Sequence, residues 1–187
     1  MKTQLLLIAM ILLIGCKKED IQPDNKPIVS KPVDTIYVGH AYGGGIIAYL
    51  FSPGELGYMA GSKHGLIITP DDLGIYVWGG LDTLISTGEN SGWNTDMIIE
   101  GLGKWNYAAY VCSIVTLWGN TGQNGTSVWC LPTQNDMIHI VKNIKLTGYY
   151  WTSSEYDKDN AWAVCGNGLS LIYKKDYHFN VRAIKIF

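Results

Sequence analysis

The sequence predicts an α+β fold, because strand patterns lie at both ends of the folded region and two helical patterns lie between them. Hydrophobic residues make up 47% of the chain and charged residues only 16%, which is typical of a folded protein. The 22 glycines, together with seven Trp and twelve Tyr, indicate tight turns between short strands and large rings in the core. The formal net charge of −2, in a sequence without a basic stripe, speaks against nucleic-acid binding.

The first strands are predicted within residues 35–51, where β-branched and aromatic residues alternate around Gly43-Gly44-Gly45. No helical pattern follows these glycines, so they indicate a tight bend rather than a phosphate-binding loop. A further short strand is expected from His64 to Ile68.

The first helical pattern begins near Asn94, a residue type that caps helix N-termini. Apolar residues then recur three or four positions apart, which predicts one buried helix face. Gly101 and Gly103 interrupt this pattern and weaken it. The residues expected on the buried face are Ile98, Leu102, Trp105, Ala109, Cys112 and Val115.

The second helical pattern follows Pro132, with Thr133 as the expected N-cap and Asp136 in the first turn. Its buried face is expected to consist of Met137, Val141 and Ile144. Short strands follow in the remaining chain, which completes the α+β order. They are expected at residues 149–153, 161–165, 169–173 and 181–187.

The N-terminal residues resemble a bacterial lipoprotein signal peptide. Lys2 precedes an apolar run from Leu5 to Ile14, which is too short to span a bilayer. The run ends in Leu13-Ile14-Gly15-Cys16, which resembles a lipobox. We therefore expect a cleaved signal peptide at residues 1–15 and lipidation of Cys16, the alternative being an ordinary signal with a chance cysteine.

The segment after Cys16 is expected to tether the domain to a membrane. Lys17-Lys18-Glu19-Asp20 resembles the surface-export signal of Bacteroidetes lipoproteins, although it could also be the start of a solvated linker. Pro23, Pro27 and Pro32 lie among polar residues and indicate an extended linker, so residues 16–34 form the lipidated N-terminus and linker. The expected location is the bacterial outer membrane, at the cell surface, with a ligand-binding domain at residues 35–187.

Several short motifs occur in a fixed order along the folded region. The most specific are Trp129-Cys130-Leu131-Pro132-Thr133 and Tyr150-Trp151-Thr152-Ser153-Ser154-Glu155. With them, residues 36–187 resemble the bacterial family named after the Fibrobacter major paralogous domain, which is similar to the C-terminal domain of the Legionella collagen-like adhesin. The other motifs are Gly44-Gly45-Ile46-Ile47-Ala48-Tyr49, His64-Gly65-Leu66-Ile67, Pro70-Asp71-Asp72, Trp78-Gly79, Thr87-Gly88, Asn94-Thr95, Ala108-Ala109-Tyr110-Val111-Cys112, Ala161-Trp162 and Val181-Arg182-Ala183-Ile184.

The resemblance implies a C-type-lectin-like fold with two helices, a long loop region and a terminal antiparallel β-sheet. It also implies a surface lipoprotein that binds an extracellular protein or glycan, and some lipoproteins of this kind are diversified by retroelements that mutate adenines. Diversified and ordinary family members are both open alternatives. The implied fixed frame is Trp151, Ser153, Ser154, Ala161, Trp162, Gly168, Val181 and Arg182, and the implied exchangeable positions are Cys165, Gly166, Tyr177, His178, Phe179 and Asn180.

The sequence contains no recognisable catalytic or metal motif, so we expect no catalytic residue, no metal and no cofactor. The histidines do not pair with one another or with a cysteine at metal-ligand spacing. Cys112 and Cys130 are expected to be small buried hydrophobes or to form one disulfide. Two alternatives to a binding protein are a structural envelope lipoprotein and an enzyme related to the formylglycine-generating enzymes, which share the implied fold.

The candidate ligand surface is expected in the C-terminal third, because its Tyr, His, Asn, Asp and Ser side chains suit adaptable recognition. Residues 155–160 could instead bind calcium, although Lys158 opposes a cation, and Gly119–Gly125 is an alternative ligand loop. Trp129, Trp151 and Trp162 are expected in the core. The predicted ligand residues are Glu155, Tyr156, Lys158, Asn160, Asn167, Ser170, Tyr173, Tyr177, His178 and Asn180.

Overall fold

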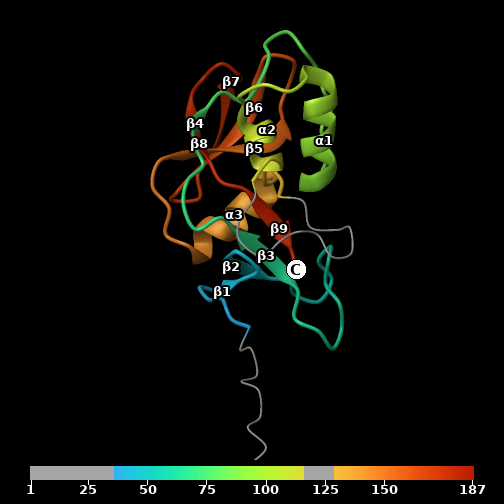
Figure 1. Cartoon of the computed structure of the whole chain (residues 1–187), viewed down its shortest axis with the longest axis vertical. Coiled ribbons are helices and arrows are strands. Elements are labelled where there is room, and N and C mark those ends of the chain that lie inside the picture. Colours follow the sequence, from blue (N-terminus) through green and yellow to red (C-terminus); the bar gives the residue numbers. More distant parts are fainter. Residues whose placement is uncertain (1–35, 116–128) are drawn as a thin grey trace, which may run out of the picture. The chain divides into compact units, whose positions relative to one another are not determined.

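Two β-sheets and three helices make up the part of the chain that the structure, a computed structural model, describes, which is residues 36–115 and 129–187 (Figure 1). The fold is mixed α+β and mostly β, as the sequence predicts. Cys16, the linker up to residue 34 and the loop Gly119–Gly125 lie outside the described residues. Among the described residues, no helix is long and apolar enough to cross a membrane.

The four-stranded sheet joins the beginning of the domain to its end, in the order β1-β2-β3-β9. Its central strand β3 is an unbroken apolar run and is buried at every position, as expected for a strand covered on both faces. Antiparallel pairing sets Leu66 opposite Ile186 on one side and Tyr49 on the other. The strands are β1 (Ala41–Tyr42), β2 (Gly45–Leu50), β3 (Gly65–Ile68) and β9 (Ile184–Ile186).

The five-stranded sheet has the order β4-β8-β5-β6-β7, and all its pairs are antiparallel except β5 with β8. Trp151 is paired with Ala163, so a large ring and a small side chain share one position across the strands. The strands are β4 (Gly74–Tyr76), β5 (Tyr149–Glu155), β6 (Asn160–Cys165), β7 (Ser170–Lys174) and β8 (Phe179–Val181).

The single helix expected after Asn94 is in fact two helices, α1 (Ser91–Leu102) and α2 (Ala108–Ser113). The break falls at Gly103, which adopts a φ of 76° that favours glycine. Asn90, not Asn94, caps α1, since its side chain accepts a hydrogen bond from the Trp93 N–H. Trp105 lies in the exposed connection between the helices, so its predicted burial is wrong.

Helix α3 (Gln134–Asn143) begins where the sequence predicts. The Thr133 side chain accepts a hydrogen bond from the Asp136 N–H at 3.1 Å, and the Asp136 carboxylate accepts one from the Thr133 N–H at 2.9 Å. This reciprocal pair is a capping box and fixes the start of the helix. Met137 is fully buried in the second hydrophobic cluster, while Val141 and Ile144 pack against it.

The last predicted strand is also divided, into β8 and β9, because the chain changes sheets at Arg182-Ala183. Arg182 holds this crossing in place: its Nε donates to the Asp72 carboxylate at 2.6 Å and its Nη1 donates to the Thr69 carbonyl at 2.9 Å. Strand β4, which is only three residues long, is not predicted by the sequence.

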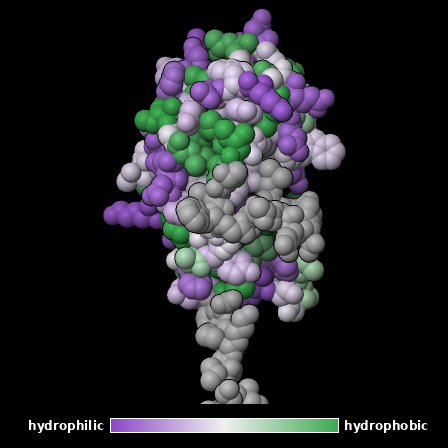
Figure 2. All heavy atoms as spheres, in the orientation of Figure 1, coloured by the Kyte–Doolittle hydropathy of each residue, from purple (hydrophilic) through white to green (hydrophobic). Residues whose placement is uncertain are grey.

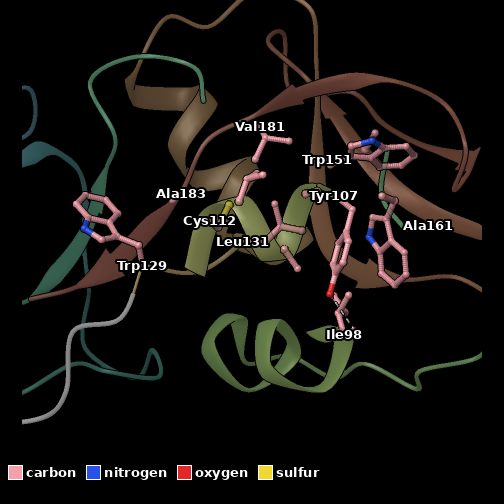
Figure 3. Close-up of a cluster of buried hydrophobic side chains, with 14 of the residues drawn as sticks. Ile98, Tyr107, Cys112, Trp129, Leu131, Trp151, Ala161, Val181 and Ala183 are labelled. Carbon is pink, nitrogen blue, oxygen red and sulfur yellow. Dashed lines mark hydrogen bonds between the residues drawn. The ribbon is translucent and has the colours of Figure 1, made fainter. Parts of the chain in front are cut away.

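One hydrophobic cluster packs α1 and α2 against the five-stranded sheet, and Figure 3 shows Tyr107, the N-cap residue of α2, reaching towards Ile98 of α1. A second cluster packs α3 against both sheets. Trp129 and Trp151 are buried, which confirms two of the three predicted core tryptophans. Trp162 is only half-buried, because it lies on the sheet face where Tyr156 partly covers it, so its assignment to the core is wrong.

The three described cysteines are free thiols. Cys112 and Cys130 are buried, which fits the expectation of small hydrophobes rather than the alternative of a disulfide. Burial raises the pKa of the Cys112 thiol well above its ordinary value and that of Cys130 to about 12. Neither thiol is suited to nucleophilic chemistry, which requires the thiolate.

Candidate functional site

The predicted ligand residues all lie in or beside the five-stranded sheet, but they do not share one surface. Tyr173 is paired with Ala161 and Ile172 with Trp162, and neighbouring side chains along a strand point to opposite faces. The exposed ring of Tyr156 contacts Trp162 edge to face, at 5.7 Å between ring centroids. Tyr156 therefore lies on the opposite face of the sheet from Tyr173.

Glu155 is not available to a ligand, because its side chain is only 3% exposed. Its carboxylate accepts hydrogen bonds from Lys175 Nζ at 2.6 Å and from the N–H groups of Ile85 and Ser86 at 3.0 and 2.6 Å. The expectation that Glu155 contacts a ligand is therefore wrong. Its role is to hold the long loop between β4 and α1, which is green at the top of Figure 1, against the sheet.

Lys175, the ion-pair partner of Glu155, is not identified by the sequence patterns. Its side chain is fully buried, and Nζ also donates to the carbonyl oxygens of Thr83 at 2.7 Å and Lys158 at 2.9 Å. The ammonium lies 4.6 Å from the ring centroid of Trp78, where a cation is attracted to the ring face. No local pattern marks Lys175 for burial, since its neighbours Lys174 and Asp176 are exposed.

The charged side chains of the acidic loop between β5 and β6 have hydrogen-bond or ion-pair partners within the protein. The Asp157 carboxylate accepts from the N–H groups of Asp159 and Asn160, each at 2.8 Å, and from the Asn160 side-chain amide. Lys158 forms an ion pair with Asp82. Among the described residues, no group of three or more His, Cys, Asp or Glu side chains could hold a metal ion.

Three further predicted residues are dispersed. Asn167 is exposed in the turn between β6 and β7, and its side chain accepts a hydrogen bond from the Leu169 N–H at 3.0 Å. Ser170 accepts one from the Gln134 side chain at 2.6 Å, which ties β7 to α3. Asn180 is half-buried and donates to the Thr147 carbonyl at 3.4 Å. These contacts stabilise the fold and leave only Asn167 clearly open to solvent.

The structure does bring Tyr173 and Tyr177 together, in an aromatic cluster with Tyr149 and Phe179. The Tyr173 ring contacts Phe179 edge to face at 4.8 Å and Tyr149 at 5.5 Å between centroids. Tyr177 lies 5.6 Å from Tyr173 and 6.1 Å from Phe179. Such edge-to-face and tilted pairs are stabilising, so the rings support one another.

The aromatic cluster packs on the hydrophobic core on one side and is exposed to solvent on the other. Phe179 lies 4.8 Å from the fully buried ring of Trp151, whose indole N–H donates to the Tyr76 carbonyl at 2.9 Å. Tyr177 is 50% exposed, and its neighbour His178 is exposed as well. A side-chain hydrogen bond with Tyr149 raises the pKa of Tyr173. The rings are therefore held in place before any ligand arrives, and the outer ones keep an open side.

The positions expected to be exchangeable divide into two kinds. Tyr177 and His178 are exposed and can vary without disturbing the core. At Gly166, however, a Cβ atom would lie 2.1 Å from the Leu146 carbonyl oxygen, a separation that no side chain tolerates. The expectation that Gly166 is freely exchangeable is therefore wrong. Among the expected frame residues, Trp151, Ser153, Ala161 and Val181 are buried.

A second exposed surface is formed where the β4–α1 loop meets the acidic loop. Leu81 and Leu84 are exposed there, beside Asp82 and Thr83, which contact Lys158 of the acidic loop through an ion pair and a hydrogen bond. Figure 2 shows that hydrophobic residues form separate patches on the viewed side of the molecule, with hydrophilic residues between them. This surface lacks the mutual ring support of the aromatic cluster, so we regard it as the weaker candidate.

No protein-family model matches the chain, and no curated protein matches it.

Proposed function

We propose that this protein is a surface-displayed lipoprotein that binds an extracellular protein or glycan through the aromatic cluster of a C-type-lectin-like domain. The observation that carries the proposal is the cluster itself, in which Tyr173 and Tyr177 contact each other and Phe179. Phe179 in turn packs on the buried Trp151, and Tyr177 remains exposed. Tyr offers a large contact area with few rotatable bonds and a polar tip, and aromatic anchors often dominate binding energy.

The arrangement of the chain supports the C-type-lectin-like assignment. Helices lie in the middle of the sequence, and a largely antiparallel sheet follows them. The long loop that packs on this sheet lies before α1, whereas the resemblance implies a loop region after the helices. The first and last strands share a sheet, which closes the domain. Three helices replace the two that the resemblance implies, because Gly103 divides the first one.

The lipobox-like Leu13-Ile14-Gly15-Cys16 supports an anchored location. Replacing Cys16 with Ser should release the protein from washed membranes. Protease treatment of intact cells should remove the wild-type chain if it faces outward. Retention of the Cys16→Ser chain on membranes would contradict the anchor.

Retroelement diversification supplies a separate prediction about the gene. If the exposed positions Tyr177 and His178 are exchanged in this way, the 3′ end of the gene should have a nearby copy that differs only at adenines, beside a reverse transcriptase. Because the backbone leaves no room for a side chain at Gly166, that codon should be constant among expressed variants. A diversified codon 166 in folded variants would refute the steric reasoning.

The binding proposal is tested with cells that display the full chain, applied to a printed glycan array and to immobilised fibronectin, collagen and laminin. We expect the Tyr173→Ala/Tyr177→Ala/His178→Ala variant to lose the binding of the wild type while it is displayed at an equal level. The matched control replaces Tyr37 and Tyr58, which are exposed outside the five-stranded sheet. Equal loss in both variants, or none in either, would overturn the assignment of the surface.

A further inference from the structure

A cleft of about 590 Å³ lies between the four-stranded sheet and the N-terminal ends of α1 and α3. Its floor is a row of cross-strand partners, Tyr49, Leu66 and Ile186. Phe51 and Leu56, on the loop that follows β2, add apolar walls. The volume falls in the range of small-molecule sites.

An aromatic pair forms one side of the cleft. The imidazole of His139, on α3, stacks on the Tyr49 ring at 4.3 Å and 26° between ring planes. The Tyr49 hydroxyl donates a hydrogen bond of 2.5 Å to the Glu55 carboxylate, which also accepts one from the Ser52 N–H at 2.6 Å. The Ser52 N–H and then the Tyr49 hydroxyl hold the pKa of Glu55 below its ordinary value. Glu55 is therefore a carboxylate at neutral pH and is fixed in position.

The charged side chains around the cleft are mostly acidic. Glu55, Glu89 and Asp136 line it, its lining includes no Lys or Arg, and His139 is its one basic side chain. None of the ion pairs among the described residues involves these three acids. Glu89 accepts a hydrogen bond from the Asn135 side chain at 3.1 Å, so its protein partner is neutral.

The two helix N-termini at the cleft do not favour an anion. The Asn90 side chain already accepts the Trp93 N–H at the start of α1, and the Thr133–Asp136 capping box occupies the start of α3. Asp136 also places a carboxyl group where an anion would otherwise bind. Charge complementarity therefore selects a cation.

We propose that this cleft binds a small organic cation, an ammonium or guanidinium group on an apolar stem. The stem would lie on the floor of Leu66 and Ile186, and the charged group would lie among Glu55, Glu89 and the face of Tyr49. The site lies on the four-stranded sheet, so it is separate from the aromatic cluster and does not depend on the proposed function.

The experiment titrates the purified full chain with hexylammonium by calorimetry, with hexanol and hexanoate as the neutral and anionic probes of equal length. We expect hexylammonium to bind at least about tenfold more tightly than either probe. The Glu55→Gln/Glu89→Gln variant keeps the shapes of both side chains and should bind it about tenfold more weakly. Glu100→Gln is the matched control, because Glu100 is exposed on α1 outside the cleft lining.

Three results would overturn the proposal. They are equal binding of the three probes, unchanged hexylammonium binding by the Glu55→Gln/Glu89→Gln variant, and no binding of hexylammonium at millimolar concentration. In the last of these cases, binding of a trilysine peptide would indicate a protein partner instead. If the double variant does not fold, as judged by circular dichroism, the Tyr49→Leu variant removes the ring face and should weaken hexylammonium binding more than hexanol binding. Variants of Tyr173 and Tyr177 should leave hexylammonium binding unchanged, which separates this proposal from the first.

Discussion

Replacing Lys175 with Met should destabilise the domain more than any surface substitution. The change keeps an apolar stem of similar length but removes the ammonium group. The Lys175 side chain is fully buried, and its ammonium donates three hydrogen bonds. It leaves the Glu155 carboxylate, whose side chain is 3% exposed, without its cation. The Thr83 and Lys158 carbonyl oxygens lose a donor at the same time.

The size of the effect follows from the burial of the pair. Removing one member of a buried ion pair costs about 3–5 kcal/mol, because the other charge stays desolvated. In a domain of this size, that cost lowers the melting temperature by about 10 °C. The attraction between the ammonium and Trp78 is lost as well, so we expect the upper half of this range.

The assay is urea unfolding of the purified full chain, followed by tryptophan fluorescence. Lys174→Met is the matched control: Lys174 is exposed, so its loss should cost less than about 0.5 kcal/mol. The Lys175→Met/Glu155→Gln double variant should be more stable than the sum of the single effects predicts, because no unpaired charge remains. Unfolding of Lys175→Met at the same urea concentration as Lys174→Met would show that the buried ion pair does not stabilise the domain.

Three other predictions concern stability and thiol chemistry. Trp151→Ala should cost about 3–5 kcal/mol, whereas Trp162→Ala should cost clearly less because Trp162 is half-buried; equal losses in urea unfolding would contradict the burial that the structure shows. Burial raises the pKa of Asp136 in the folded protein above its ordinary value of 3.8. The protonated carboxyl group therefore stabilises the fold at pH below 3.8, and this stabilisation is lost as the pH rises through the pKa of the folded state. The stability of the wild type relative to Asp136→Asn should therefore fall between acidic and neutral pH, and a difference that rises with pH would show that the carboxylate is stabilised instead. In the Cys16→Ser chain, a thiol reagent should label Cys165 first and reach Cys112 and Cys130 only on unfolding; rapid labelling of all three would mean that the buried thiols are accessible.

Local sequence signals predict local structure well in this chain. The capping box at Thr133 and Asp136 identifies the start of α3. The break of the first helical pattern at Gly103 is not predicted, because Gly101 and Gly103 only weaken a pattern that continues beyond them. Strand patterns identify most of β2, β3, β5, β6 and β7. Strand β4 is missed, because its three residues carry little pattern and its pairing with β8 joins positions more than one hundred residues apart.

The candidate site is only partly predictable for the same reason. Tyr177 and His178 lie in a turn with exposed neighbours, so their exposure follows from the sequence. The burial of Glu155 depends on Lys175, twenty residues later, and on the N–H groups of the loop at Ile85, seventy residues earlier. The lack of room for a side chain at Gly166 depends on the nearby carbonyl oxygen of Leu146. None of these relations has a spacing that a sequence pattern could reveal.

Contact between the aromatic cluster and the ligand can be measured by titrating the full chain with the glycan or matrix protein that binds the displayed wild type. The dissociation constants of Tyr177→Ala and Tyr177→Phe are then compared. An aromatic anchor contributes about 2 kcal/mol or more, so the Ala variant should bind about 30-fold more weakly, while the Phe variant keeps the ring and should lose less. Dissociation constants of both variants equal to that of the wild type would show that the ligand binds elsewhere and would contradict the account.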